Sequence, residues 1–151
     1  MADVDVVGLG YQGLTVHQFC KNAVSQGVSV IGDVRLTPLS RKPGLSKTAL
    51  SSELRSVGVE YRHFPALGNP KWNRAGFGGT PDELRAAQQV FLDHVLSTAE
   101  ARRAVDELRE LAADVRVALM CFEADELRCH RRQILAHVLG ADMLLAASAV
   151  R

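Results

Sequence analysis

Two cysteines and their polar neighbours in the last third of the chain carry the strongest chemical signal in the sequence. Cys121 and Glu123 follow an apolar segment, and Cys129 is followed at once by His130 and Arg131. We expect Cys129 to lie at the start of a helix, where the helix dipole and neighbouring cations stabilise a thiolate. Cys129 is therefore a candidate nucleophile. Alternatively, Glu123 and His130 are the candidate acid and base. A half-buried thiol that caps the helix would account for the same pattern.

The spacing of these residues argues against two familiar reactions and does not favour a metal. A C-x5-R phosphatase loop that starts at Cys121 would need arginine where the chain has Leu127. A C-x4-R sulfurtransferase loop would need arginine in place of Glu126. The side chains of zinc-ligating type are those of Cys121, Cys129, His130 and His63. Their spacing matches no common C-x2-C pattern, so the sequence predicts no metal site.

An acid and two arginines follow the second apolar segment. Asp33 and Arg35 come at the end of a buried strand, and Arg41 follows in a proline-containing loop. Open α/β sheets bind ligands at this end of their strands, and the guanidinium fork matches phosphate and carboxylate oxygens. We therefore expect a cleft at this end of the sheet, in which Asp33 takes part in catalysis. The residues expected to bind an anion there are Arg35, Arg41, His63 and Arg131. The alternative is an internal Asp33–Arg35 pair that holds the loop.

A glycine turn after the first strand fits another kind of site. Gly8, Gly10 and Gly13 form a G-x-G-x-x-G pattern, and Asp33 lies 20 residues beyond Gly13. Such a turn can bind the pyrophosphate of a dinucleotide at a helix N-terminus. Because the chain has room for only one nucleotide-binding half, a tight strand-to-helix turn is the simpler interpretation. A nicotinamide-dependent reductase stays a further hypothesis.

Alternating strands and helices must position these residues. Runs of β-branched residues predict strands over residues 4–9, 28–34, 59–63 and 115–121. Helical spacing of apolar residues predicts helices over 15–26, 47–57, 80–113 (as two helices meeting near Ser97 and Thr98) and 129–139. A last apolar run over 143–150 is a short helix or an edge strand. The alternation predicts an α/β fold, with helices on both faces of a parallel sheet.

A long stretch rich in glycine and proline, residues 65–79, contains the only tryptophan, Trp72. Loops of this length are commonly functional, so Trp72 is a candidate lid or base-stacking residue, or else an anchor for its loop. Residues 35–74 contain eight Lys or Arg and two acids. This local excess is either a basic rim around an anion site or a solvated face.

Length and composition limit the class of protein. The 151 residues are enough for a single domain over 1–151, and the net charge of +1 predicts no acidic partner from bulk charge. Three cysteines do not suit a secreted disulfide scaffold. No apolar run approaches the ~18–20 residues that cross a bilayer. We expect a cytoplasmic protein that does not contact a membrane.

Taken in chain order, these motifs resemble one known family. They are D-V-R-x-x-P-x-S-R from Asp33 to Arg41, the segment Tyr61–His63 with Leu67 and Gly68, and C-x-E followed by C-H-R from Cys121 to Arg131. Over nearly its whole length the chain resembles the domain-of-unknown-function 488 family. The resemblance implies a three-layer α/β/α sandwich with a mostly parallel central sheet and no settled activity. One departure is Gln12, where the family tends to have serine.

A parallel sheet would bring these candidate residues to one crevice at the carboxyl ends of its strands. The first hypothesis is an enzyme that acts on a phosphorylated or nucleotide-like substrate in this cleft. The second is a non-catalytic nucleotide or nucleic-acid binding module that uses Trp72 and the basic segment. The expected partner is a phosphate-bearing small molecule or a nucleic acid, and the sequence identifies no cofactor.

Overall fold

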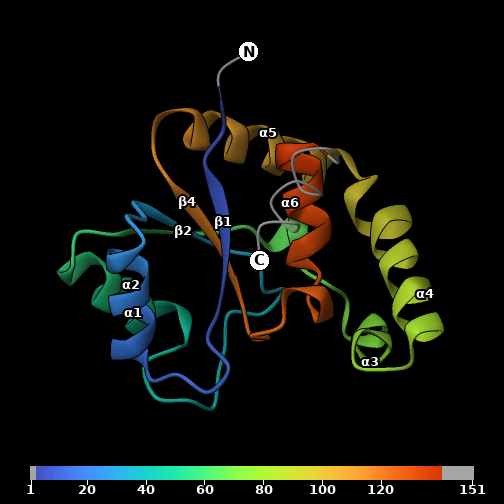
Figure 1. The fold of residues 1–151 in the computed structure, drawn as a ribbon, viewed down its shortest axis with the longest axis horizontal. Helices are drawn as coiled ribbons and strands as arrows, with labels where there is room; N and C mark the ends of the chain where they lie inside the picture. Colours follow the sequence, from blue (N-terminus) through green and yellow to red (C-terminus); the bar gives the residue numbers. More distant parts are fainter. Residues whose placement is uncertain (1–2, 141–151) are drawn as a thin grey trace.

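A parallel sheet lies between two layers of helices in the computed structural model, which describes residues 3–140 (Figure 1). Its strands follow the order β1 (Val6–Gly10), β4 (Val117–Cys121), β2 (Val30–Asp33) and β3 (Glu60–His63). Strand β4 is buried along its whole length and pairs with β1 on one side and β2 on the other. The four-stranded sheet is parallel throughout, which confirms the predicted α/β fold.

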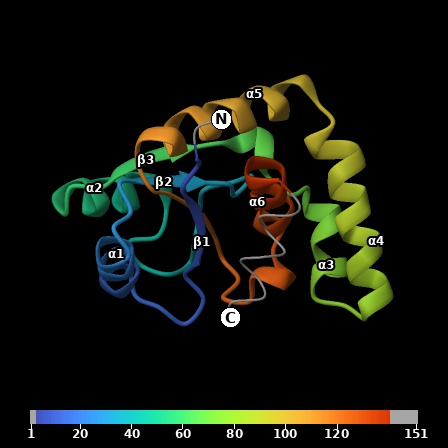
Figure 2. The same ribbon diagram turned by 45° about the horizontal axis from the view of Figure 1, so that its top comes forward.

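The helices cover both faces of the sheet. One layer consists of α1 (Val16–Ser25) and α2 (Lys47–Ser56), and the other contains α5 (Ala99–Asp114) and α6 (Arg131–Leu139). Beyond α6, the short α3 (Arg74–Phe77) packs beside α4 (Pro81–Phe91), as Figure 2 shows. The architecture is therefore the expected three-layer sandwich, extended at one end by α3 and α4.

Each face of the sheet has its own apolar core. Adjacent residues of β4 point to opposite faces, as the pleat of a strand requires. Met120 packs with Phe19 in the layer of α1 and α2, whereas Leu119 belongs to the core that contains Leu108 and Ile134. A strand that is buried on both faces needs apolar residues at every position, which explains the continuous apolar run of β4.

Capping residues define the helix starts that the sequence predicts. Thr15 and Thr80 each form a capping box, with Gln18 and Glu83 respectively. Thr98 accepts a hydrogen bond from the backbone of Ala101 at the start of α5, so the predicted break between two helices is confirmed. The predicted strands 4–9, 28–34 and 115–121 extend past the observed ones at one or both ends.

The stretch 65–79 is more ordered than the sequence predicts. It contains 3-10 turns over Pro65–Leu67 and Lys71–Asn73, followed by α3. The buried Asn73 amide donates to the Ala87 carbonyl at 3.0 Å, which attaches the segment to α4. This contact joins distant residues, so local composition could not reveal it. The predicted element over 143–150 lies outside the described residues, and within 3–140 no helix is long and apolar enough to span a membrane.

The glycines of the first strand allow a close approach of the chain. A Cβ atom on Gly10 would overlap the backbone carbonyl of Glu123, and one on Gly8 would overlap the side chain of Glu126. Gly13 has a positive φ of 77°, which favours glycine. The fold thus favours glycine at all three positions of the G-x-G-x-x-G pattern, through close packing at Gly8 and Gly10 and the backbone angle at Gly13. This supports the interpretation of the pattern as a tight turn.

The close approach at Gly10 predicts a specific loss of stability. We expect Gly10→Ala to lower the free energy of unfolding by roughly 1–3 kcal/mol, because the backbone of Glu123 must move. Gly78→Ala is the matched control, since the nearest heavy atom to its added Cβ is the Ala75 carbonyl oxygen at 3.7 Å. Urea denaturation measures both, and equal stability of the two variants would contradict the account.

Candidate functional site

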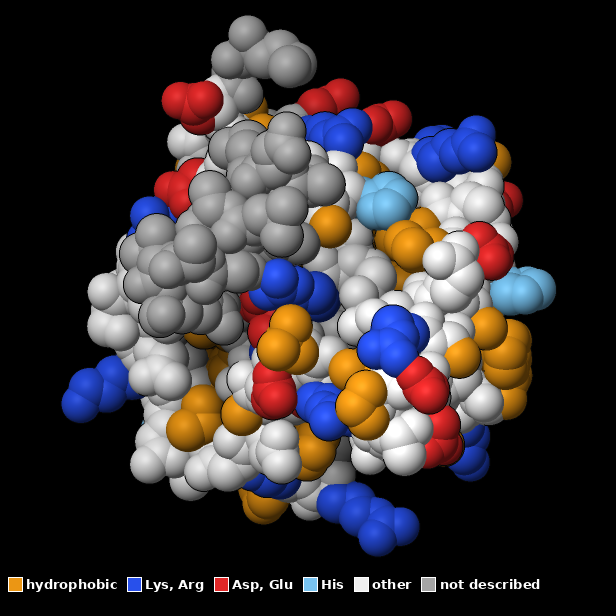
Figure 3. Space-filling view, turned by 45° about the vertical axis from the view of Figure 1, so that its right-hand side comes forward, with side chains coloured by type: hydrophobic (Ala, Val, Ile, Leu, Met, Phe, Trp, Pro, Cys, Tyr) orange, Lys and Arg blue, Asp and Glu red, His pale blue; other side chains and the backbone are white. Residues whose placement is uncertain are grey.

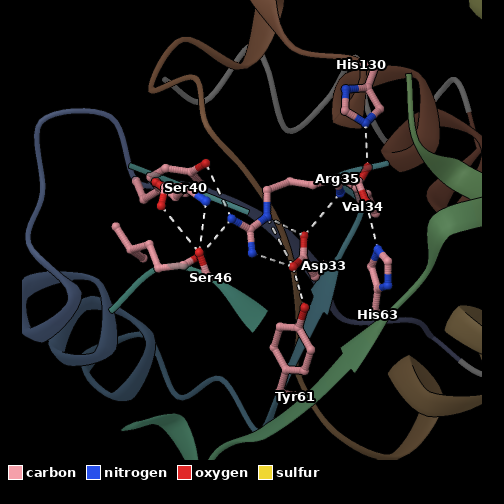
Figure 4. Close-up of polar contacts among 10 residues, drawn as sticks. Asp33, Val34, Arg35, Ser40, Ser46, Tyr61, His63 and His130 are labelled. Carbon is pink, nitrogen blue, oxygen red and sulfur yellow. Dashed lines mark hydrogen bonds and ion pairs between the residues drawn. The ribbon is translucent and has the colours of Figure 1, made fainter. Parts of the chain in front are cut away.

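A buried ion pair between Asp33 and Arg35 lies at the carboxyl end of β2. Arg35 Nε donates to Asp33 Oδ1 at 2.9 Å, and Arg35 Nη2 donates to Asp33 Oδ2 at 2.7 Å. The Tyr61 hydroxyl donates to the same carboxylate (Figure 4). Arg35 Nη1 also donates to the Leu45 carbonyl at 2.7 Å. Asp33 is 0% and Arg35 6% exposed, so the pair is internal to the fold.

The Asp33 carboxylate stabilises the charged form of Arg35. Burial alone would lower the pKa of Arg35, but the hydrogen bonds and the charge of Asp33 raise it above the ordinary value. Burial and the hydrogen bond to Asp33 raise the pKa of Tyr61, so its hydroxyl keeps its proton and remains a donor. The internal pairing that was the alternative interpretation of Asp33 and Arg35 is the arrangement found in the structure.

The turn that follows β2 accepts hydrogen bonds from two histidines. His130 Nε2 lies 2.8 Å from the Val34 carbonyl oxygen, and His63 Nε2 lies 2.8 Å from the Arg35 carbonyl oxygen (Figure 4). A carbonyl oxygen only accepts, so Nε2 of each ring carries a proton. In the neutral ring of His130, Nδ1 is then without a proton and can accept or bind a cation.

His130 Nδ1 faces two thiols. Cys121 Sγ lies 3.9 Å and Cys129 Sγ 3.8 Å from this nitrogen. Cys121 ends β4, whereas Cys129 and His130 directly precede α6, so two elements bring the three side chains together. All three are buried, with exposed fractions of 7% for Cys121, 1% for Cys129 and 6% for His130.

The proximity of these groups shifts their proton affinities. The Cys129 thiol and His130 hold the pKa of Cys121 well below its ordinary value, although burial opposes this. Burial and the neighbouring Cys121 raise the pKa of Cys129 well above its ordinary value. Burial alone would lower the pKa of His130, but the interaction with Cys121 raises it above its ordinary value. The pKa of Glu123 is also raised, chiefly by burial and to a lesser extent by the charge of Cys121. Burial and Cys121 thus act on Cys129 against the stabilised thiolate that its place before a helix predicts.

A cavity of about 140 Å³ lies over this cluster. Its wall contains Cys121, Glu123 and His130, together with Arg74 and Arg128. Arg128 Nη1 donates to the Gly79 carbonyl at 2.7 Å, which fixes one side of its guanidinium group. Glu123 Oε2 is buried and has no hydrogen-bond partner within residues 3–140. The cavity wall thus combines two arginines with a glutamate, one of whose carboxylate oxygens is buried and unpartnered among the described residues.

The structure brings some of the predicted site residues to the cavity and leaves others away from it. Glu123, His130 and Arg35 line the cavity, although most of the Arg35 guanidinium group is occupied by Asp33, Leu45 and Tyr11. The predicted residues that do not line it are Asp33, Arg41, His63, Cys129 and Arg131. Their functional roles stay predictions.

The positions of these five residues differ. Cys129 belongs to the cluster beside the cavity wall, and His63 holds the Arg35 carbonyl. Arg41 is exposed. Arg131 is 2% exposed and its Nε lies 3.7 Å from Glu126 Oε1, so this arginine is directed into the protein.

Two arginines of the cavity were missed by the sequence analysis. Arg128 immediately precedes the C-H-R motif, and Arg74 lies in the basic stretch 35–74. The excess of basic residues was the only signal for Arg74, and no sequence spacing relates Arg74 to Arg128. They meet because α3 and the turn Glu126–Arg128 lie on the same side of the sheet, where Arg128 bonds to the Phe77 and Gly79 carbonyls.

The face that presents α3 and α4 carries side chains of mixed type. Figure 3 shows Lys and Arg interspersed with acidic and apolar side chains over the described part of this face. Several apolar side chains are largely exposed: Leu36, Leu39, Trp72, Phe122 and Leu127. Of these, Leu36, Leu39 and Phe122 also line the cavity. The wall of the cavity is therefore partly apolar, and its cationic residues are Arg35, Arg74 and Arg128, with His130 beside them.

The parallel sheet and the cavity at the carboxyl ends of its strands define an α/β protein with a candidate site in the usual place for this class. The chain belongs to the family described as Domain of unknown function DUF488, whose model matches residues 15–139. This confirms the family resemblance of the sequence motifs. Neither a curated protein nor a solved structure matches the chain.

The buried pair predicts a large effect on stability when one partner is removed. We expect Arg35→Ala to lower the free energy of unfolding by about 3–5 kcal/mol, because it leaves the Asp33 carboxylate buried without its cation. Arg102→Ala, on the exposed side of α5, should stay within about 0.5 kcal/mol of the unaltered protein. Urea denaturation followed by circular dichroism tests this, and an Arg35→Ala variant as stable as the control would contradict it.

Proposed function

We propose that the protein is an enzyme that acts on a phosphorylated or nucleotide-like substrate in the cavity at the carboxyl ends of the strands. The observation that carries the proposal is the composition of the cavity wall. Arg74 and Arg128 supply cations, and Glu123 supplies a carboxylate oxygen that no described residue satisfies. Enzymes that act on phosphate esters need both kinds of group, one to bind the anion and one to move a proton.

The size of the cavity limits which part of the substrate enters it. A protein cavity of about 150 Å³ binds one benzene molecule, so a cavity of about 140 Å³ accommodates a phosphoryl group and its nearest atoms. A complete nucleotide would extend beyond it onto the rim. The exposed side chains of Leu36, Leu39 and Phe122 provide an apolar surface there for a base or a carbon skeleton. The proposed substrate therefore binds with its phosphoryl end inward.

The arginines of the cavity are suited to bind that phosphoryl end. Arg128 donates from Nη1 to the Phe77 and Gly79 carbonyls, and within residues 3–140 its Nε and Nη2 have no partner. Arg74 donates from Nε to the Asn69 carbonyl, and its two Nη atoms are likewise without a partner among the described residues. Each guanidinium group is anchored on one side and can donate to phosphate oxygens from the other.

Glu123 is the residue we assign to proton transfer. Its backbone packs against Gly10, which fixes the position of the carboxylate relative to the sheet. It lines the same cavity as the arginines, so a substrate held by Arg74 and Arg128 would lie within its reach. His130 also lines the wall, but its Nε2 donates to the Val34 carbonyl and its Nδ1 faces the two thiols, so we assign the proton transfer to Glu123 alone. The acid–base role of His130 and the nucleophilic role of Cys129, which lies outside the wall, stay predictions.

One observation favours a non-catalytic nucleotide or nucleic-acid binding module as the alternative. Trp72 is 69% exposed and stands between Lys71 and Asn73, close to Arg74, so its ring is available for base stacking. The ring lies 6.0 Å from that of His94 in an edge-to-face contact, which gives it a defined orientation. This alternative predicts binding that weakens steeply with salt and no turnover.

Binding and turnover of phosphate esters by the intact protein test the proposal. The probes are inorganic phosphate, nucleoside monophosphates and a panel of phosphate monoesters and diesters. We expect Arg128→Ala to weaken ligand binding by roughly 10- to 100-fold, the value of a charged hydrogen bond. Glu123→Gln should lower kcat by about 100-fold with little change in binding. Titration calorimetry and phosphate release measure the two effects.

The controls separate a lost contact from a lost fold. Arg102→Ala removes an exposed arginine from α5, far from the cavity lining, and should bind and turn over as the unaltered protein does. Arg74→Ala provides a second test on an exposed residue of the cavity. Binding that is unchanged in both Arg128→Ala and Arg74→Ala would refute the proposal. Binding without turnover, abolished by Trp72→Ala, would establish the alternative.

A further inference from the structure

We infer that Cys121, Cys129 and His130 bind a zinc-class cation, with a fourth coordination position that opens into the cavity. Two thiolates and one imidazole form a ligand set typical of zinc, and three protein ligands with one open position are typical of catalytic zinc. Metal binding is measurable without any substrate. Only the catalytic part of the inference, that the metal serves the reaction at Glu123, rests on the proposed function.

The distances between the ligand atoms suit a tetrahedral ion. Zinc bonds of about 2.3 Å to sulfur and 2.0–2.1 Å to nitrogen, at tetrahedral angles, place sulfur and nitrogen about 3.5 Å apart. In the structure the two sulfurs lie 3.9 Å and 3.8 Å from His130 Nδ1. The three ligand atoms all lie within 4.8 Å of one another. Coordination would therefore need a contraction of a few tenths of an ångström at each sulfur–nitrogen pair and of up to about 1 Å between the two sulfurs, which lie about 3.8 Å apart in a tetrahedral site.

The hydrogen bonds around His130 prepare this ring for a metal. Its Nε2 donates to the Val34 carbonyl, which leaves Nδ1 as the ligand atom and fixes the plane of the ring. A backbone carbonyl is a common partner for the second nitrogen of a metal-binding histidine. The ring of Phe91 also packs against His130, with 5.2 Å between the ring centres. The imidazole is thus held in the orientation that coordination requires.

The two thiols form no disulfide, so they can bind a metal, and burial shields them from solvent. Both Cys121 and Cys129 are free and buried. Their positions come from different elements, the end of β4 and the residue before His130, so an ion would join the sheet to the start of α6. On binding, the two thiol protons pass to solvent and the sulfurs coordinate as thiolates. No oxidant or reductant takes part.

The unpartnered oxygen of Glu123 indicates what occupies the fourth position. A buried carboxylate oxygen without a donor is costly, and Glu123 Oε2 has none within the described chain. Cys121, His130 and Glu123 line the same cavity. A water molecule bound to the ion would donate to Glu123 and supply the missing hydrogen bond. An ion-bound water next to a carboxylate base is an effective nucleophile toward a phosphoryl group.

Zinc binding by the full-length reduced protein tests the inference. After treatment with a chelator and its removal, we expect one equivalent of Zn²⁺ to bind by titration calorimetry. Co²⁺ in its place should give the visible bands of a tetrahedral ion and the near-ultraviolet band of a cobalt–thiolate bond. Cys129→Ser should weaken zinc binding by more than about tenfold. Its far-ultraviolet circular dichroism establishes that it folds.

Cys20→Ser is the matched control, because Cys20 is also a free and buried thiol but belongs to the core beneath α1. It should bind zinc as the unaltered protein does. Reduced protein that binds no zinc, or zinc binding that Cys129→Ser leaves unchanged, would overturn the inference. Turnover of a phosphate ester by the metal-free protein would overturn the catalytic part and leave the proposed function standing. Stoichiometric zinc in a protein that binds no phosphorylated ligand would support the metal site and refute the proposed function.

Discussion

The Asp33–Arg35 ion pair is the interaction on which the rest of the candidate site depends. Moving two charges out of water is costly, and a buried pair is tolerated only when further hydrogen bonds satisfy both partners. Here Tyr61 donates to the carboxylate and Leu45 accepts from the guanidinium group. The pair folds the chain back directly after β2. It therefore determines where the carbonyl groups of Val34 and Arg35 point.

Those two carbonyl groups connect the ion pair to two histidines, because they accept hydrogen bonds from His130 and His63. The Val34 carbonyl holds His130, and His130 in turn directs Nδ1 toward Cys121 and Cys129. The ring of His130 thus connects Val34, which directly follows β2, with Cys121 at the end of β4 and Cys129 before α6. The same arrangement explains why Asp33 and Arg35 are buried beside the candidate site with most of their polar atoms paired to other protein groups. Their roles in catalysis and anion binding stay predictions.

Much of the fold could be predicted from the sequence because its signals are local. Thr15 and Thr80 start helices through contacts with residues three positions away, and the apolar run of β4 reflects burial on both faces. The candidate site was predictable in part, because the carboxyl ends of parallel strands converge. From this rule we expected Glu123 and His130 in one crevice, and both residues line the cavity. The roles of Arg74 and Arg128 were not, because the packing of α3 near the turn Glu126–Arg128 is a long-range property. The sequence left open whether Arg35 pairs with Asp33 or binds a ligand, and the structure shows the internal pair.

The protonation of the His130 ring tests the central claim most directly, that the turn after β2 orients this histidine toward the thiols. Long-range nitrogen–proton correlation spectra of the labelled protein identify which ring nitrogen carries a proton. The account predicts a proton on Nε2, hydrogen-bonded to the Val34 carbonyl, in every protonation state of the ring. A neutral ring with its only proton on Nδ1 would contradict the account, because Nε2 could not then donate to the carbonyl and Nδ1 could not bind a cation.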